Sequence, residues 1–127
     1  MCREILWASA VLALIVPGLG APPAFAAQAI HQVGVASWYG PGFQGRRTAS
    51  GARFDMHAMT AASRHLPLDH WAKVTDLATR RSAWVWVNDR GPYIRGRIID
   101  LSKAAATRLG YRRQGLAEVA VKCPLIG

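Results

Sequence analysis

Apolar and polar positions alternate along several short stretches of the chain, which predicts β-strands. The clearest stretch is residues 82–88, where Trp84 and Trp86 would face one side of a sheet and Val85 and Val87 the other. Similar patterns predict further strands over residues 34–39, 70–77, 96–101 and 117–123. Five or six short strands separated by glycine- and proline-containing turns favour a small closed or nearly closed β-barrel. The pattern therefore predicts a mainly β fold.

One helix is predicted together with both of its ends. Ser102 is a suitable N-cap for the segment that follows it, and Gly110 is a suitable stop. The other segments are expected to be less regular: one or two helical turns over residues 56–62, a long surface loop over 43–53 and a linker over 27–33. The barrel domain is then expected to cover residues 34–124.

Residues 1–26 predict a secretory signal peptide. A positive charge near the start precedes an apolar run over residues 6–16, and Ala24 and Ala26 fit the small-x-small cleavage pattern. The alternative is an uncleaved membrane anchor, although the run is shorter than the ~20 residues of a spanning helix. Cys2 lies at the wrong end for a lipoprotein signal, so no lipid anchor is expected. We therefore expect secretion across the inner membrane into the periplasm or cell envelope.

The chain of 127 residues carries a formal net charge of +9, from 16 basic and 7 acidic residues. In an exported protein this excess favours an acidic partner in the cell envelope, such as a carboxylate-bearing glycan, over nucleic acid. The alternative is a solvated basic surface without such a partner. Two cysteines are too few for a dense disulfide scaffold or a four-cysteine zinc site. Cys123, the cysteine beyond the predicted signal peptide, is expected to be buried in the last strand.

Several kinds of catalytic or metal-binding motif are absent from the sequence. There is no glycine-rich phosphate loop and no nucleophile elbow. Neither a metal nor another cofactor is expected, because the four histidines lie in no metal-ligand spacing: His31, His57, His65 and His70.

Among the few carboxylates, Asp89 has the most suggestive position for chemistry. It ends the aromatic-rich strand at an Arg-Gly-Pro turn, where a side chain can be held over a groove. The alternative is that Asp89 only bonds its own backbone within the turn. Asp100 precedes the predicted helix, and we expect it to be a local cap or a hydrogen-bond acceptor inside the barrel.

Aromatic and arginine side chains near the predicted turns favour a carbohydrate-binding groove. Aromatic rings pack against sugar rings, and arginines hold carboxylates through two hydrogen bonds. Trp84 or Trp86 is expected to lie in the core, whereas Trp38, Tyr39 and Tyr93 are left open between the core and the groove. The arginines considered for the groove are Arg46, Arg47, Arg90 and Arg95.

Five sequence blocks together resemble the rare lipoprotein A family: ASWYG, GRRTASG, FDM-x-AMTAA, VNDRGP and RIIDLS. The resemblance covers residues 34 to about 122. It implies a six-stranded double-psi β-barrel, related to expansin and barwin domains, in a secreted cell-wall protein. Characterised members are lytic transglycosylases that cut peptidoglycan glycan strands lacking stem peptides. Peptidoglycan is therefore the partner that the resemblance implies.

The resemblance carries one of three family site residues over to this chain. The Asp of the D-R-G-P block falls on Asp89, whereas the family's Glu position holds Ala52 and its His position holds Ser63. In such enzymes the 6-hydroxyl of muramic acid attacks its own anomeric carbon and gives a 1,6-anhydro end, so a single residue suffices as acid and then base. The resemblance implies that Asp89 has both roles. The alternative, which Ala52 and Ser63 favour, is an expansin-like peptidoglycan-binding module without cleavage.

Overall fold

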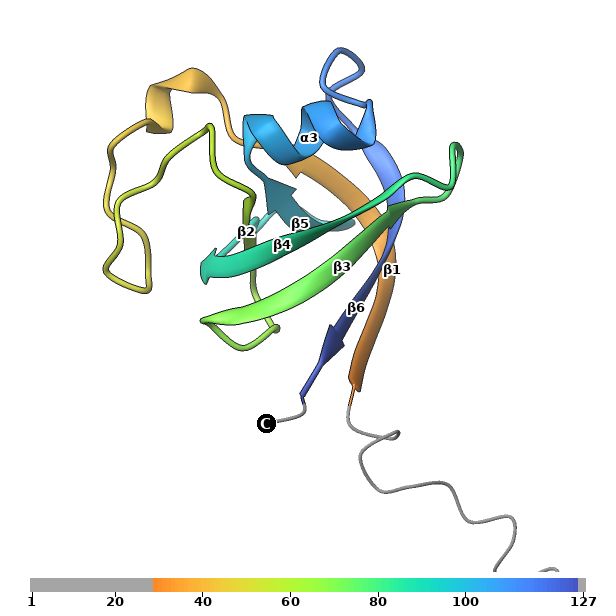
Figure 1. Ribbon diagram of the computed structural model, residues 1–127, viewed down its shortest axis with the longest axis horizontal. Coiled ribbons are helices and arrows are strands. Elements are labelled where there is room, and N and C mark those ends of the chain that lie inside the picture. The colour runs from red at the N-terminus through yellow and green to blue at the C-terminus, as the bar shows by residue number, and fades with distance from the viewer. Residues whose placement is uncertain (1–28, 126–127) are drawn as a thin grey trace, which may run out of the picture.

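The computed structural model describes residues 29–125, so the predicted signal peptide of residues 1–26 lies outside the described range. The described residues form six strands, one α-helix and one short 3₁₀-helix (Figure 1). In chain order these elements are β1 (Ala29–Trp38), η4 (Pro41–Phe43), β2 (Thr60–Ser63), β3 (His70–Asp76), β4 (Ser82–Asp89), β5 (Arg97–Leu101), α3 (Lys103–Leu109) and β6 (Ala117–Pro124). No helix within residues 29–125 is both long and apolar enough to cross a membrane.

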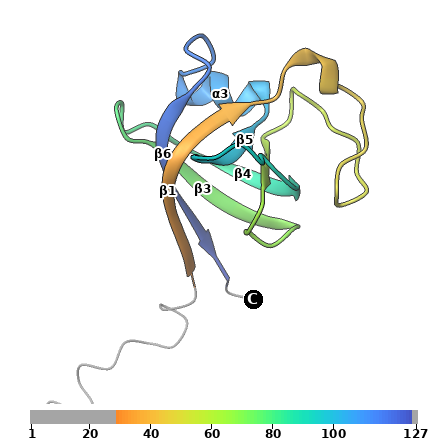
Figure 2. The ribbon, with the colours of Figure 1, turned by 180° about the vertical axis from the view of Figure 1, so that it is seen from behind.

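The six strands close into a barrel in the order β1–β5–β2–β4–β3–β6. β1 pairs with β5 and β2 with β4 in parallel, and the other neighbours are antiparallel. Closure leaves no unpaired sheet edge among these strands. Figures 1 and 2 show the barrel from opposite sides, with α3 across one end. The prediction of a mainly β, six-stranded barrel is confirmed.

Small and branched aliphatic side chains fill the barrel. On β4, Val85 and Val87 are fully buried, whereas Trp84 is 47% exposed and Trp86 is partly buried on the outer side. The prediction that Trp84 or Trp86 lies in the core is therefore wrong. Alternation separates the two faces of β4 correctly, but inward positions of a narrow barrel have room for valine rather than indole. Cys123 is buried as expected, and burial raises the pKa of its thiol.

Strand β2 replaces the helical turns expected over residues 56–62, so that prediction is wrong. β2 pairs with β4 on one side and with β5 on the other, and all four of its residues are buried. A strand covered on both faces lacks the alternation by which strands are predicted. Its structure is decided by pairing partners that are distant in sequence.

Strand β1 begins at Ala29, which corrects the expected linker over residues 27–33. These first strand residues pair antiparallel with β6, from Ala29 opposite Pro124 to Val33 opposite Ala120. Little of their side-chain surface is fully buried, so backbone hydrogen bonds to β6 hold this part of β1 in place. Such pairing leaves no strong hydrophobic pattern in the sequence.

Helix α3 is capped at both ends as predicted. Ser102 Oγ accepts a hydrogen bond from the Ala105 amide at 3.1 Å, and Gly110 ends the helix in the left-handed conformation with a φ of 93°. Beyond the helix, the buried Tyr111 hydroxyl donates to the Ser37 carbonyl oxygen at 2.8 Å. These contacts fix α3 and the following turn across one end of the barrel.

Candidate active site

Residues 40–58, which we call the roof loop, fold beside the outer face of β2 (Figure 1). Phe54 of the roof loop packs with Tyr39 and Ala62 in a small apolar cluster outside the barrel core. Next to this cluster lies a cavity of about 380 Å³. The roof loop therefore converts part of the outer barrel surface into a partly enclosed site.

Thirteen residues line this cavity, and they combine two aspartates, four aromatic rings and three arginines. They are Tyr39, Phe43, Arg46, Arg47, Thr48, Phe54, Ala62, Asp89, Arg90, Gly91, Pro92, Tyr93 and Asp100. Carboxyls can transfer protons, and cations and aromatic rings can bind charged and ring-shaped parts of a ligand. We therefore take this cavity, rather than a second one of similar size, as the candidate active site.

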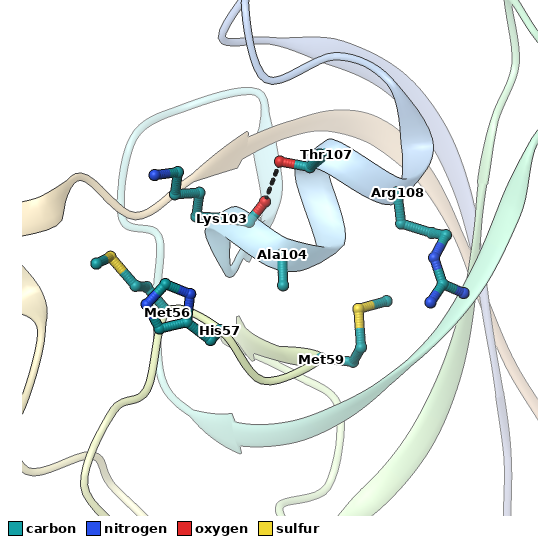
Figure 3. Close-up of a pocket in the computed structure, with 7 residues that line it drawn as sticks. All are labelled: Met56, His57, Met59, Lys103, Ala104, Thr107 and Arg108. Carbon is teal, nitrogen blue, oxygen red and sulfur yellow. Dashed lines mark hydrogen bonds between the residues drawn. The ribbon is translucent and has the colours of Figure 1, made fainter.

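The second cavity, of about 390 Å³, lies against α3 (Figure 3). Its lining contains two methionines and three basic side chains but no carboxylate: Met56, His57, Met59, Lys103, Ala104, Thr107 and Arg108. The Thr107 hydroxyl is engaged locally, donating to the Lys103 carbonyl oxygen at 2.8 Å. Within residues 29–125, no group of three or more His, Cys, Asp or Glu side chains could hold a metal ion.

The register of three neighbouring strands brings the two aspartates of the site together. Ala62 of β2 lies opposite Asp89 of β4 on one side and opposite Asp100 of β5 on the other. Adjacent strands are about 4.8 Å apart, so the two aspartate Cα atoms are about 10 Å apart. The small side chain of Ala62 leaves the space between the carboxyls open. Asp100 is a site residue that the sequence reasoning missed.

Asp89 is held by three hydrogen bonds from different parts of the site. Its Oδ1 accepts from the amides of Ala49 and Arg90, each at 2.9 Å. Its Oδ2 accepts from the Tyr39 hydroxyl at 2.9 Å. The contact with the Arg90 amide is the local turn bond that was the alternative to a site role. The other two bonds tie the carboxyl to the roof loop and to the end of β1, so its orientation over the cavity is fixed.

Tyr39, whose hydroxyl donates the hydrogen bond to Asp89, is itself buried. Its ring stacks on Phe54 with centroids 4.3 Å apart, and it forms a T-shaped pair with Phe43 with centroids 5.4 Å apart. Burial raises the pKa of Tyr39 well above its usual value, and the hydrogen bond and charge of Asp89 raise it further. Tyr39 therefore stays a neutral hydrogen-bond donor to Asp89.

Asp100 has different surroundings from Asp89. Its Oδ1 accepts a hydrogen bond from Ser37 Oγ at 3.0 Å, so Asp100 is a hydrogen-bond acceptor, but it lines the cavity on the outer surface and does not lie inside the barrel as expected. Burial raises the pKa of Asp100, the Ser37 hydrogen bond and the charge of Arg97 oppose this, and the charge of Asp89 raises it again. Asp100 thus keeps its proton to higher pH than an exposed aspartic acid.

The arginine side chains of the cavity contact backbone carbonyl oxygens or an aromatic ring rather than the aspartates. Arg90 Nη1 donates to the carbonyl oxygens of Ser63 at 3.0 Å and Leu66 at 2.6 Å. Arg47 Nη1 donates to the Gly51 carbonyl oxygen at 2.7 Å, and the Arg46 guanidinium lies 5.5 Å from the centre of the Phe43 ring. The cations are therefore positioned around the cavity while the carboxyls remain available.

The structure brings most of the residues proposed from sequence to one cavity. Asp89, Tyr39, Arg46, Arg47, Arg90 and Tyr93 line it together. Trp38 and Arg95 lie outside its lining. Trp38 packs partly against the barrel core and its Nε1 donates to the Arg112 carbonyl oxygen at 3.1 Å, while Arg95 is exposed.

The positions of the family's Glu and His also lie outside the cavity lining. Ala52 is exposed in the roof loop, where its carbonyl oxygen accepts from the Thr48 amide at 2.8 Å. Ser63 is buried, and its Oγ accepts from the Leu66 amide at 3.0 Å. His65, two residues further, is exposed and does not line the cavity. The two carboxyls of the cavity are therefore those of Asp89 and Asp100.

A family model described as "Lytic transglycolase" matches residues 31–121. The chain belongs to this family. Among curated lytic transglycolase relatives, the chain is 50% identical over 96 residues to "Endolytic peptidoglycan transglycosylase RlpA" of Pseudomonas aeruginosa (strain UCBPP-PA14), covering 76% of this chain and 28% of the relative. The protein of the same name from Neisseria meningitidis serogroup A is 45% identical over 119 residues, covering 94% of this chain and 50% of the relative. The chain spans at most about half the length of these relatives.

Solved structures with low sequence identity to this chain share the fold. The "Streptomyces papain inhibitor" aligns with a TM-score of 0.59 at 22% identity, covering 73% of this chain and 94% of that one. An expansin of Clavibacter michiganensis aligns with a TM-score of 0.59 at 21% identity, covering 74% of this chain and 50% of that one. The double-psi β-barrel prediction and the resemblance to the rare lipoprotein A family are both confirmed.

Proposed function

We propose that this chain cleaves peptidoglycan glycan strands as a lytic transglycosylase and is exported to the cell envelope. The observation that carries the proposal is the pair of carboxyls, Asp89 and Asp100, facing one cavity across Ala62. Family membership supports the substrate class, since the relatives are named for peptidoglycan cleavage. The predicted signal peptide supports export.

In the proposed reaction, Asp100 is the acid and Asp89 is the base. Asp100 gives its proton to the glycosidic oxygen as the bond from that oxygen to the anomeric carbon of muramic acid breaks. The muramic acid 6-hydroxyl bonds to the same carbon, and its proton passes to Asp89. One product has a free 4-hydroxyl and the other a 1,6-anhydro ring, and no water is consumed. Solvent exchange then returns a proton to Asp100 and removes one from Asp89.

This division of roles differs from the expectation that Asp89 is both acid and base. Both oxygens of Asp89 accept hydrogen bonds, from the Tyr39 hydroxyl and two amides, and the Asp89 carboxyl donates none to another described residue, so we assign it the acceptor role. Burial raises the pKa of Asp100, which suits a proton donor. Two carboxyls in unlike surroundings are the usual basis for separate acid and base roles.

Substrate binding is assigned to the cations and rings around the two carboxyls. Arg46, Arg47 and Arg90 surround the cavity with positive charge, which complements the lactyl carboxylate of muramic acid. Phe43 and Tyr93 are exposed at its mouth and offer ring faces to a sugar. We further propose a preference for strands without stem peptides, because the roof loop encloses the cavity.

Mass spectrometry of peptide-stripped glycan strands tests the activity directly. The purified barrel is incubated with these strands, and the products are searched for 1,6-anhydro-muramic ends. Such ends are expected with the wild-type chain and are expected to form about 10²–10⁴-fold more slowly with Asp89→Asn or Asp100→Asn. Tight binding of the strands without any anhydro ends would overturn the enzymatic proposal.

The second function to consider is a peptidoglycan-binding module without cleavage. It is favoured by Ala52 and Ser63, which leave the family's Glu and His positions without an acid or base. Ala52→Glu is the informative variant, because Ala52 is exposed and a longer side chain there meets no packed core. Anhydro ends formed by Ala52→Glu but not by the wild-type chain would identify the natural protein as a binding module.

A further inference from the structure

A row of exposed side chains crosses four strands on the outer face of the barrel. His31 of β1 lies opposite Lys122 of β6, and Lys122 also lies opposite Lys73 of β3. Lys73 in turn lies opposite Trp84 of β4. Directly opposed residues point to the same side of a sheet, and four neighbouring strands span about 14 Å. The row therefore forms one continuous surface.

Two further indoles extend this row along β3 and β4. Trp71 lies opposite Trp86, with ring centroids 5.1 Å apart and planes at 70°. Trp71 is 51% exposed and Trp84 47% exposed. We define the aromatic-basic face as His31, Lys122, Lys73, Trp84, Trp86 and Trp71. Its basic half is hollowed into a depression of about 220 Å³ whose lining includes His31, Lys73 and Lys122.

The charges of the aromatic-basic face are not explained by the stability of the barrel. Directly opposed like charges such as Lys73 and Lys122 destabilise a sheet. The next outward-facing carboxylate on β6 is Glu118, four residues and about 13 Å along the strand from Lys122. Asp76 of β3 is buried and accepts hydrogen bonds from the amides of Ala78 and Thr79. Within residues 29–125, neither of these two carboxylates is therefore placed to neutralise the exposed lysines.

The aromatic-basic face is separate from the candidate active site but connected to it by β4. No residue of the face lines the active-site cavity. On β4, Trp86 precedes Asp89 by three residues, a distance of about 10 Å along a strand. The face and the cavity therefore lie on the same strand, about three residues apart.

We propose that the aromatic-basic face binds peptidoglycan that still carries its stem peptides, while the cavity takes the stripped strand. The exposed indoles pack against sugar rings, and Lys73, Lys122 and His31 pair with the carboxylates of the stem peptides. This assignment rests on the proposed function, because that function makes peptidoglycan the ligand. The face would hold the protein on the intact wall beside strands that have already lost their peptides.

A pelleting assay with isolated cell walls tests the face. Intact walls are compared with walls stripped of stem peptides by an amidase. Wild-type protein is expected to bind intact walls more tightly, and Lys73→Glu with Lys122→Glu to weaken that binding by about tenfold. Trp84→Ala is expected to weaken binding to both kinds of wall. Lys73→Gln with Lys122→Gln provides a milder pair if the charge-reversed protein folds poorly.

The matched control is Arg112→Glu with Arg113→Glu, a pair of exposed arginines that follow α3 and lie outside the face. This pair changes the net charge by the same amount, and binding is expected to stay within about twofold of wild type. If both double variants lost wall binding equally, the loss would be a general effect of net charge, and the proposed binding face would be wrong. Equally tight binding of polyglutamate in place of cell walls would overturn peptidoglycan as the ligand.

The Asp89→Asn variant separates this proposal from the enzymatic one. It is expected to bind intact walls as wild type does, because Asp89 is not part of the face. If wall binding depends on Lys73 and Lys122 but no anhydro ends form, the proposed cleavage is wrong and the proposed binding face stands. If anhydro ends form but wall binding does not depend on Lys73 and Lys122, the proposed cleavage stands and the proposed binding face is wrong.

Discussion

The active-site cavity and the aromatic-basic face both lie on the outer surface of one barrel, yet they hold charge in opposite ways. In the cavity, Asp89 accepts three hydrogen bonds and the Arg90 guanidinium donates two, so the charged groups are fixed in direction. On the face, Lys73 and Lys122 are exposed and opposed to each other. The roof loop packs over the active-site region and forms part of the cavity wall, but it does not cover the aromatic-basic face.

The difference matters because proton transfer and polymer binding have different requirements. An acid and a base must be held at defined positions, and burial adjusts their proton affinity. A charged polymer can be held by mobile cations that need only the right sign and spacing. We therefore expect substitutions in the cavity to change turnover by large factors and those on the face to produce smaller effects.

The largest effect is expected for the two aspartates of the cavity. Asp100→Asn and Asp89→Asn each remove an acid–base group, and each is expected to lower turnover by about 10²–10⁴-fold. The rate of anhydro-end formation on peptide-stripped strands measures this loss. Asp69→Asn is the matched control, since Asp69 is exposed and does not line the cavity. Full turnover in Asp100→Asn would remove Asp100 from the mechanism.

The raised pKa of Asp100 also predicts a change in stability with pH. Because burial favours the protonated form, the folded state loses stability as the pH rises through the pKa of Asp100. Asp100→Asn cannot ionise, so it is expected to unfold at a higher temperature than wild type at neutral pH. The difference should disappear below the ordinary aspartate value of 3.8. Thermal unfolding at several pH values measures it, and a constant difference would contradict the assignment.

A smaller effect is expected for Tyr39→Phe, which keeps the ring and removes the hydroxyl. The variant loses the 2.9 Å hydrogen bond to Asp89, and a bond to a charged group contributes about 1.5–3 kcal/mol. The free energy of unfolding is expected to fall by about that amount or less, and turnover to fall with it. Urea unfolding and the anhydro-end assay measure the two changes. Tyr93→Phe, at an exposed ring, serves as the control for loss of a hydroxyl in the unfolding measurement.

A comparable loss of stability is expected for Ser63→His, which introduces the family's residue. Ser63 is 1% exposed, and its Oγ accepts from the Leu66 amide. A larger side chain in this packed position is expected to cost about 1–3 kcal/mol in the free energy of unfolding. Ala52→Glu, at an exposed position, is expected to change it by less than about 0.5 kcal/mol. Equal stability of both variants would show that the buried site around Ser63 can accommodate a histidine side chain without strain.

Local signals in the sequence predict much of the barrel, but they do not predict the site in full. The alternation of β4 and the Ser102 cap of α3 depend on neighbouring residues, and both predictions are confirmed. Asp89 is singled out because it ends a strand at a turn. β2 and the place of Asp100 depend on which strands pair, and the cavity exists only because the roof loop packs on Ala62. No local pattern contains that information.

The smallest expected effect concerns the aromatic-basic face. Lys122→Glu places a carboxylate opposite Lys73 and removes a like-charge pair, so the free energy of unfolding is expected to rise by about 0.2–1 kcal/mol. Urea unfolding at low and high salt measures the gain, which should shrink as salt screens the charges. Lys122→Gln, which removes the repulsion and adds no attraction, should give a smaller gain. A loss of stability at low salt would mean that the two lysines do not oppose each other. A gain in stability together with weaker binding to cell walls would mean that the two lysines lower the stability of the barrel and serve binding. In the cavity, by contrast, Asp89 and Arg90 are already hydrogen-bonded within the protein.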